Sequence, residues 1–303
     1  MAIIISGASG DLGSKVTQQL LQSVPASELI LLTRNPDSLA ELAAKGAQVR
    51  KADFDDTETL TKALAGGHIM LLISTLSIGR RVEQHSNAIN AAKQAGVSHI
   101  VYTSSLGIQP QTPSISGREH YATEELIRAS GLTFTILRNT WYAEVTPTMI
   151  FKPGIDSGMI MANTGDGCVA PVCKQDCANS AAAVLSSPSQ HAGSIYEITG
   201  PDLINFTDIA ALASEYSGKP VSFKNISAEE SLAIFDAMGV NREYEEGMLS
   251  DSGHAWASEE MVTYQTAIKE HYFAICSHHV ELITGKPATP IRAVIEANKE
   301  AFL

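Results

Sequence analysis

The chain has 303 residues, of which 44% are apolar and 18% are charged, so it can bury a substantial core and is too apolar to be disordered. Its length predicts two domains, or one large domain with an appendage. It carries 21 basic and 33 acidic residues, a net charge of −12. A field of that sign repels phosphate, which argues against nucleic acid as a partner.

The sequence also argues against a membrane protein and against a secreted disulfide protein. No apolar run reaches the ~18 residues that a membrane span needs, and the N-terminal MAIIISGASG lacks the basic segment of a signal peptide. Four cysteines are too few for a disulfide framework, and the spacing of Cys168, Cys173 and Cys177 does not match a zinc site. We therefore expect a cytoplasmic protein with reduced thiols, no metal and no membrane contact.

The first half of the chain alternates short apolar segments with helical ones. The predicted strands cover residues 2–6, 29–33, 48–51, 69–74, 100–104 and 132–138, and the helices between them cover 11–22, 37–45, 57–64, 80–94 and 118–129. Apolar strands that each lead into a helix are typical of a parallel sheet buried on both faces. This pattern predicts a Rossmann-type, doubly wound α/β fold for residues 1–145.

Beyond Trp141 this alternation stops, and residues 146–303 predict a smaller, mixed α/β domain. Residues 147–172 are rich in proline and glycine and predict short strands and turns. Further elements are expected as a helix over 176–185, a strand over 195–199 and a helix over 205–216. Thr207 is the expected cap of that last helix, and most of the remainder is predicted to be helical.

A glycine-rich loop joins the first strand to the first helix. Gly7, Gly10 and Gly13 have G-x-x-G-x-x-G spacing. Gly7 permits the tight turn out of the strand, Gly10 lets a pyrophosphate approach the backbone, and Gly13 lets the helix pack closely. The N-terminus of this helix attracts phosphate. The loop therefore predicts dinucleotide binding by Gly7, Ser9, Gly10, Asp11, Leu12 and Gly13. The alternative is a turn with a helix-packing contact.

The end of the second strand predicts which dinucleotide binds. An acid there would hold a ribose 2′-hydroxyl, whereas an arginine accommodates a 2′-phosphate. Thr33 and Arg34 stand here, with no acid until Asp37, which favours NADP(H) over NAD(H); a solvated loop arginine is the alternative. After the third strand, Asp53 and Phe54 are placed to contact adenine, although an aspartate there is also an ordinary helix cap. The predicted cofactor site is completed by Ser74, Thr75, Ser104 and Asn139, which follow later strands.

Residues 7–13 (GASGDLG), 33–36 (TRNP) and 52–56 (ADFDD) together resemble the NmrA-like group of atypical short-chain dehydrogenase/reductases. Residues 120–124 (HYATE) and 130–144 (SGLTFTILRNTWYAE) resemble the signature of type-2 NAD(P)H:quinone oxidoreductases and triphenylmethane reductases. The resemblance implies an NAD(P)H-dependent oxidoreductase with a C-terminal substrate domain. It also implies that a strand within 194–200 returns to the main sheet.

The catalytic pair of the better-known members of this superfamily is Tyr-x-x-x-Lys, in which the lysine lowers the tyrosine pKa. Here Glu125 stands four residues after Tyr121, and the family's tyrosine and lysine positions fall near Ser116 and His120. Without the pair, hydride transfer to a quinone or conjugated cation is favoured over carbonyl reduction. His120, with an ordinary pKa of about 6.5, is a candidate acid, although a histidine without chemistry at the helix start explains it as well. Tyr121, otherwise a packing aromatic, and Ser105 are the other catalytic candidates.

Trp141 and Tyr142 follow the sixth strand, at the sheet edge where ligands of parallel sheets bind. Their rings suit a flat pocket over a nicotinamide, and they predict a small planar molecule as the substrate. The alternative is that they only seal the seam between two domains.

Residues 229–260 hold nine acids and one base and so contribute −8 of the net −12. A solvated helical surface is the ordinary explanation. A lid or a docking surface for a partner is the functional one, since methionines that suit an adaptable pocket wall lie among the acids.

Three functions fit the sequence. The first is an NADPH-dependent reductase of quinones or similar conjugated, planar acceptors. The second is a non-catalytic redox sensor of the NmrA type, which binds the dinucleotide and reports to a protein partner. The third is a reductase or isomerase of a secondary metabolite on the same scaffold.

Overall fold

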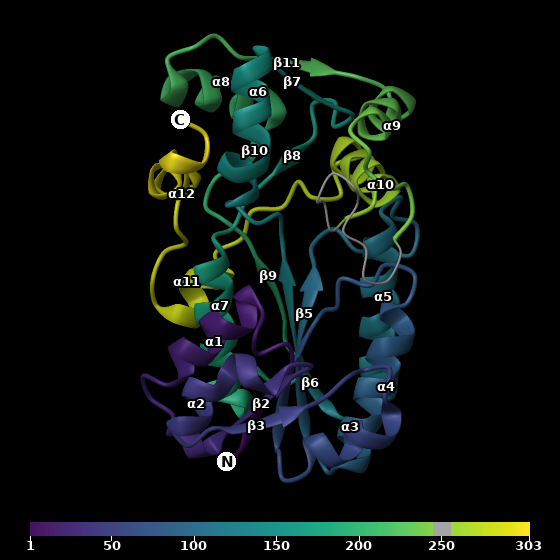
Figure 1. Ribbon diagram of the computed structural model, residues 1–303, viewed down its shortest axis with the longest axis vertical. Helices are drawn as coiled ribbons and strands as arrows, with labels where there is room; N and C mark the ends of the chain where they lie inside the picture. Colours follow the sequence, from purple (N-terminus) through teal and green to yellow (C-terminus); the bar gives the residue numbers. More distant parts are fainter. Residues whose placement is uncertain (245–255) are drawn as a thin grey trace.

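The computed structural model describes residues 1–244 and 256–303. A seven-stranded sheet in the order β3-β2-β1-β4-β5-β6-β9 forms its centre, and each neighbouring pair of strands is parallel (Figure 1). The strands are β1 (Ile3–Ile5), β2 (Leu29–Thr33), β3 (Gln48–Lys51), β4 (Ile69–Ile73), β5 (His99–Ser105), β6 (Thr133–Asn139) and β9 (Ile195–Ile198). The predicted Rossmann-type, doubly wound fold is confirmed.

Burial on both faces explains why the strands are so apolar. Every residue of β1, β2 and β5 is buried, as expected for strands that helices cover on both sides. Ile3 and Ile5 enter one core cluster and Ile4 enters another, because successive side chains point to opposite faces. At the sheet edge, β3 has only exposed or half-buried residues, among them Arg50 and Lys51, and charged side chains there discourage pairing with another chain.

Two layers of helices cover this sheet (Figure 1). One core cluster joins the sheet to α1 (Asp11–Leu20), α7 (Lys174–Ser186) and α11 (His279–Thr284). The other cluster joins the opposite face to α3 (Thr57–Leu64), α4 (Arg81–Gln94) and α5 (Ile115–Ala129). The short α2 (Ala40–Ala44) follows β2. Of the helices in the described residues, none has the length and apolar character needed to span a membrane.

The rest of the chain forms a mixed α/β part above the carboxyl ends of the strands (Figure 1). It contains α6 (Lys152–Ser157), β7 (Met159–Ala162), β8 (Cys168–Val169), β10 (Ile204–Asn205), α8 (Phe206–Ser217), β11 (Ser222–Asn225), α9 (Ala228–Ala237), α10 (Ser258–Lys269) and α12 (Ile291–Ala297). β10 pairs with β8 antiparallel and β11 with β7 parallel. A third core cluster, which includes Trp141, Phe151 and Phe273, lies among these elements.

Two expectations for this part are wrong in detail. Residues 147–172 begin with a π-helical segment (Thr146–Phe151) and α6 rather than with strands and turns. Pro147 and Pro153 stand in the first turn of these two segments, where the N–H that proline lacks would have no helical partner. The cap of α8 is Asn205, not Thr207: its side chain accepts from the Asp208 N–H at 2.9 Å and the Asp208 carboxylate accepts from the Asn205 N–H.

Segments after residue 145 also complete the main sheet. β9 pairs with β6, as the resemblance implies, with Ile136 opposite Ile195. Cys177 and Val184 of α7 are buried in the cluster that contains β1 and β2. A division of the chain at residue 145 therefore stays a prediction.

The acidic segment, residues 229–260, lies partly outside the described residues. Three of its acids, Glu245, Glu246 and Asp251, belong to residues 245–255, which the structure does not describe. Within the described part, Glu230 reciprocally caps the start of α9 with Ser227. Asp236 pairs with Arg242 at 2.6 Å. Capping and pairing account for these acids without a partner protein.

Candidate cofactor site

The glycine loop between β1 and α1 has the geometry that its sequence predicts. Gly7 has φ of +59°, a left-handed conformation that favours glycine. A Cβ on Gly13 would lie 2.3 Å from the Gly7 carbonyl oxygen, and one on Gly10 would lie 3.2 Å from the same oxygen. Glycine at position 13 therefore lets the first turn of α1 sit against the loop. The residues of that turn, whose N–H groups have no partner within the helix, line the cavity described next.

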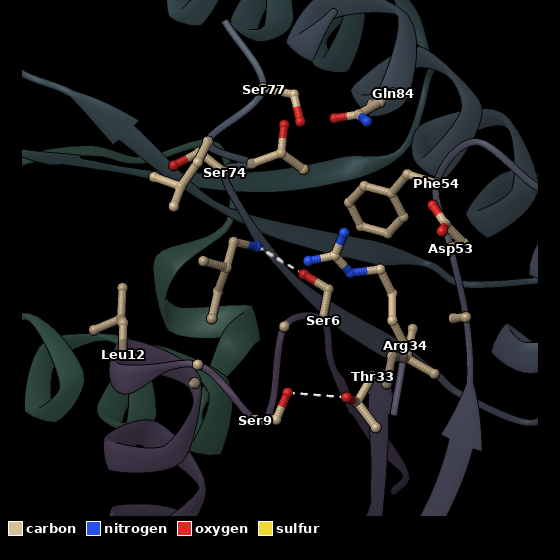
Figure 2. A pocket seen from close by; sticks show the side chains of 18 of the residues that line it. Ser6, Ser9, Leu12, Thr33, Arg34, Asp53, Phe54, Ser74, Ser77 and Gln84 are labelled. Carbon is tan, nitrogen blue, oxygen red and sulfur yellow. Dashed lines mark hydrogen bonds between the residues drawn. The ribbon is translucent and has the colours of Figure 1, made fainter. Parts of the chain in front are cut away.

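A cavity of about 650 Å³ runs along the carboxyl ends of β2, β1 and β4 (Figure 2). Of the predicted cofactor residues, it is lined by Gly7, Ser9, Gly10, Asp11, Leu12, Gly13, Thr33, Arg34, Asp53, Phe54, Ser74 and Thr75. Of the predicted substrate residues, Tyr142 lines it. The structure thus brings residues from five separate segments of the chain around one space.

One end of the cavity is built from the residues after β2 and β3. Figure 2 shows the Arg34 side chain reaching into the cavity beside the Phe54 ring, with the Asp53 side chain to the right of that ring. Thr33 is buried, and its hydroxyl is hydrogen-bonded to the Ser9 hydroxyl at 2.9 Å. Thr33 therefore ties β2 to the glycine loop, and Arg34 offers a cationic contact to a ligand here.

The middle of the cavity combines the glycine loop with the start of α7. The Asp11 carboxylate accepts from the ammonium groups of Lys15 and of Lys174, the latter at 2.9 Å. These hydrogen bonds hold the pKa of Asp11 below its ordinary value. Lys174 also lies 5.2 Å above the Tyr142 ring, and its backbone N–H donates to the Glu144 carboxylate at 3.0 Å.

The far end of the cavity contains Ser74, Thr75, Ser77 and Tyr142. The Thr75 hydroxyl is buried and has no hydrogen-bond partner among the described residues. Behind the cavity wall, the Asn139 amide donates to the Tyr142 hydroxyl at 3.5 Å. Polar residues thus line this end of the cavity, and the Thr75 hydroxyl is buried within its wall.

Some predicted contacts lie elsewhere. Trp141 is buried in the third core cluster, with its ring 6.1 Å from Phe206 and 5.7 Å from Tyr264, so the alternative of a residue that seals the seam describes it better. Ser104 does not line the cavity, because its hydroxyl donates to the buried Glu124 carboxylate at 2.8 Å. Asn139 reaches the cavity only through Tyr142.

The three predicted catalytic residues are not brought to the cavity wall. His120 is buried and its Nδ1 is hydrogen-bonded to the Tyr102 hydroxyl at 2.7 Å. Burial holds the pKa of His120 well below its ordinary value, which corrects the expectation of a histidine that titrates near neutral pH. The Ser105 hydroxyl donates to the Leu106 carbonyl at 3.1 Å, and Tyr121 is half-buried on α5.

Several residues of the cavity wall were not predicted from the sequence. They are Ser6, Leu32, Ala52, Asp55, Ile73, Leu76, Ser77, Gln84, Lys174 and Tyr244. Those next to strand ends follow from the rule that ligands bind beyond the carboxyl ends of parallel strands. Lys174 and Tyr244 come from the second half of the chain and had no such signal.

Together, the parallel sheet, the glycine loop and the cavity that crosses the strand ends define a dinucleotide-binding protein. The family model described as NAD(P)H-binding matches residues 7–188. The chain belongs to this NAD(P)H-binding family.

Similar proteins are oxidoreductases. Quinone oxidoreductase 2 of Escherichia coli (strain K12) is 39% identical over 238 residues, which cover 78% of this chain and 82% of that protein. The structure of the Escherichia coli NADPH-dependent quinone oxidoreductase QOR2 complexed with NADPH has a TM-score of 0.86 and 33% identity and covers 99% of this chain and 100% of that one. Citrobacter sp. triphenylmethane reductase complexed with NADP(H) has a TM-score of 0.85 and 30% identity, over 98% and 100% of the two chains. The predicted resemblance is confirmed, and the chain is an NAD(P)H-dependent oxidoreductase.

Proposed function

We propose that the chain is an NADPH-dependent reductase that delivers hydride to a quinone or a similar conjugated, planar acceptor. The observation that carries the proposal is that one continuous cavity is lined by Arg34, the glycine loop and Tyr142. The residues fit a dinucleotide, because the glycine loop has no room for a Cβ on Gly13 and the cationic side chain of Arg34 lines the same cavity. When bound, the nicotinamide supplies the hydride.

Preference for NADPH over NADH rests on the end of β2. Arg34 presents a guanidinium to the cavity, and such a group pairs well with a phosphate. The neighbouring Thr33 hydroxyl is already bonded to Ser9 and Asn35, so a ribose 2′-hydroxyl would find no free partner in that side chain. The solved structures of both reductases described above contain NADPH or NADP(H).

A planar acceptor suits the other end of the cavity. Tyr142 supplies aromatic surface there, and Leu76 is 75% exposed at the cavity wall. Ser116 and His120, the positions of the usual catalytic pair, do not line the cavity. An acceptor that takes up the electron pair without a protein acid, such as a quinone, therefore fits this wall better than an isolated carbonyl.

Steady-state oxidation of NADPH against a panel of quinones and cationic dyes tests this function. We expect turnover with quinones, and a lower KM for NADPH than for NADH. Tight NADPH binding without turnover of any acceptor would overturn the proposal and favour the redox sensor. Turnover confined to simple ketones or aldehydes would contradict the argument from the missing catalytic pair.

Two expectations from the sequence accompany this function as proposals. A cytoplasmic location rests on the cysteines, since Cys168, Cys173, Cys177 and Cys276 are all free thiols. A substrate domain that starts near residue 146 rests on the separate core cluster around Phe151 and Phe273. Fractionation of cells and limited proteolysis, respectively, would test them.

A further inference from the structure

Lys174 brings a second cationic side chain to the cavity. It is the first residue of α7, in the second half of the chain. Arg34 and Lys174 are the cationic side chains among the described residues that line the cavity. Arg34 lies at the end of β2, whereas Lys174 lies beside the glycine loop, where its ammonium contacts Asp11. The two cations therefore serve different places along the cavity.

A contact with the turn after β6 fixes the backbone of Lys174. The residue before α7, Cys173, does not cap the helix with its side chain. Glu144 takes this place, because its carboxylate accepts from the Lys174 N–H at 3.0 Å and from the Cys173 thiol at 3.4 Å. A carboxylate there satisfies a free N–H group and is favoured by the helix dipole. α7 also packs against α1 (Figure 1), so its first residue has a defined place beside the glycine loop.

The Lys174 side chain is held on two sides. Its ammonium donates to the Asp11 carboxylate at 2.9 Å and lies 5.2 Å from the centre of the Tyr142 ring, whose face attracts a cation. The side chain is still 27% exposed. An ammonium group has three N–H donors, so after the bond to Asp11 it can donate further bonds to a ligand in the cavity.

The first turn of α1, next to Asp11, is suited to an anion. Gly10 precedes this turn and has no side chain that could accept from its free N–H groups. Asp11, Leu12 and Gly13 form the turn and line the cavity. In dinucleotide-binding folds the pyrophosphate binds at this helix terminus. Lys174 is therefore one hydrogen bond away from the turn that receives the pyrophosphate.

The charge of Asp11 explains why a cation is needed here. Its carboxylate belongs to the same turn and would repel a pyrophosphate. Lys15 and Lys174 both donate to this carboxylate, but of the two it is Lys174 that lines the cavity. Lys15 therefore balances the charge of Asp11 from outside the cavity wall, while Lys174 can also face the ligand.

We propose that Lys174 is a cofactor contact supplied by the second half of the chain, and that its ammonium binds the pyrophosphate of the dinucleotide while Asp11 and Tyr142 hold it in place. The inference deepens the proposed function and rests on it, because it requires a dinucleotide in this cavity. Arg34 and Lys174 then divide the recognition of the cofactor. Arg34 distinguishes NADPH from NADH at the 2′-phosphate, whereas Lys174 binds a group that both dinucleotides contain.

Equilibrium titration with NADPH and with NADH, followed by cofactor fluorescence, tests Lys174. Lys174→Met keeps most of the side chain and removes its charge, and we expect both Kd values to rise about tenfold, the effect of one charge-assisted hydrogen bond. Lys174→Arg keeps a cation and should retain most of the affinity. Lys15→Met is the matched control, since Lys15 is bonded to the same carboxylate but does not line the cavity. Its Kd values should stay within about threefold of those of the parent.

A double-mutant cycle with Asp11→Asn separates a direct contact from simple charge balance. If Lys174 only neutralised Asp11, Lys174→Met would lose no affinity in the Asp11→Asn background. We expect the rise in both Kd values to persist there. Its disappearance, or a loss confined to NADPH, would overturn the assignment of Lys174 to the pyrophosphate.

Chemical modification of lysines tests the contact in the parent chain, where no variant has to fold. Labelling with an amine-reactive reagent, followed by mass spectrometry, measures the rate at Lys174 and at Lys15, the internal control, whose side chain is 34% exposed. We expect saturating NADPH or NADH to slow the labelling of Lys174 several-fold and to leave Lys15 unchanged. Equal rates at Lys174 with and without dinucleotide, or parental affinity in Lys174→Met, would overturn the inference. Failure of the parent chain to bind either dinucleotide would instead refute the proposed function.

Discussion

Replacing Arg34 by alanine should weaken NADPH binding and leave NADH binding almost unchanged. The Arg34 side chain extends into the cavity at the end of β2. Thr33 beside it is engaged with Ser9 and Asn35, so it offers no replacement contact. A hydrogen bond to a charged group contributes about 1.5–3 kcal/mol. Because Arg34 is exposed, screening by solvent favours the low end of that range.

A loss of about 1.4 kcal/mol corresponds to a tenfold rise in Kd. We therefore expect the NADPH affinity of Arg34→Ala to fall about tenfold, which titration at fixed ionic strength would measure. Lys51→Ala is the control, because Lys51 is an exposed cation at the end of the neighbouring β3 that does not line the cavity. An equal loss of NADPH and NADH affinity in Arg34→Ala would refute the placement of the 2′-phosphate at this residue.

Three further changes test other parts of the structure. Gly13→Ala should lower the free energy of unfolding by about 3 kcal/mol in urea denaturation, because its Cβ would lie 2.3 Å from the Gly7 oxygen. Glu144→Ala should cost about 1 kcal/mol and raise the NADPH KM, since the carboxylate caps α7 at the Lys174 N–H. Burial lowers the pKa of His85 from 6.5 to about 3, so between these pH values the unfolded chain binds a proton that the folded chain does not. The free energy of unfolding therefore falls as the pH drops from 6.5 to 3. His85→Gln should make the dependence of this free energy on pH shallower by about 1.4 kcal/mol per pH unit.

Controls separate these effects from general damage. Ser14→Ala, on the same helix as Gly13, should change stability by less than about 0.5 kcal/mol. Glu144→Gln keeps an acceptor at the start of α7 and should retain most of the NADPH affinity. A Gly13→Ala protein as stable as the parent would contradict the close packing of Gly13 against Gly7. An unchanged pH dependence of stability in His85→Gln would contradict the burial of His85.

Local signals made the adenosine and phosphate half of the site predictable. The glycine loop is recognisable from seven consecutive residues, and the close contact that requires glycine at position 13 is made within the same segment of the chain. Arg34 directly follows a fully buried strand. Its position at the carboxyl ends of the strands, where ligands of parallel sheets bind, therefore follows from where that strand ends. Strand boundaries were off by a residue or two, since fraying ends depend on contacts with neighbouring strands.

The catalytic half was less predictable because long-range contacts decide it. Lys174 reaches the glycine loop across 163 positions of sequence, and no local pattern marks it. Ser104 looked available as a hydroxyl after a strand, yet Glu124 from α5 takes it. Trp141 and Tyr142 are adjacent and similar, but only Tyr142 faces the cavity. Which way each points depends on the packing of the second half of the chain.

The pairing of β9 with β6 also determines how long one edge of the sheet stays open while the chain is synthesised. Synthesis of β6 ends at Asn139, whereas synthesis of β9, which pairs with its outer edge, ends only at Ile198. At about 5–20 residues per second, the ribosome leaves that strand without its partner for about 3–12 s. An open strand edge presents unpaired N–H and C=O groups that can pair with another chain. A pause in translation before Ile198 would therefore endanger the protein more than one after it.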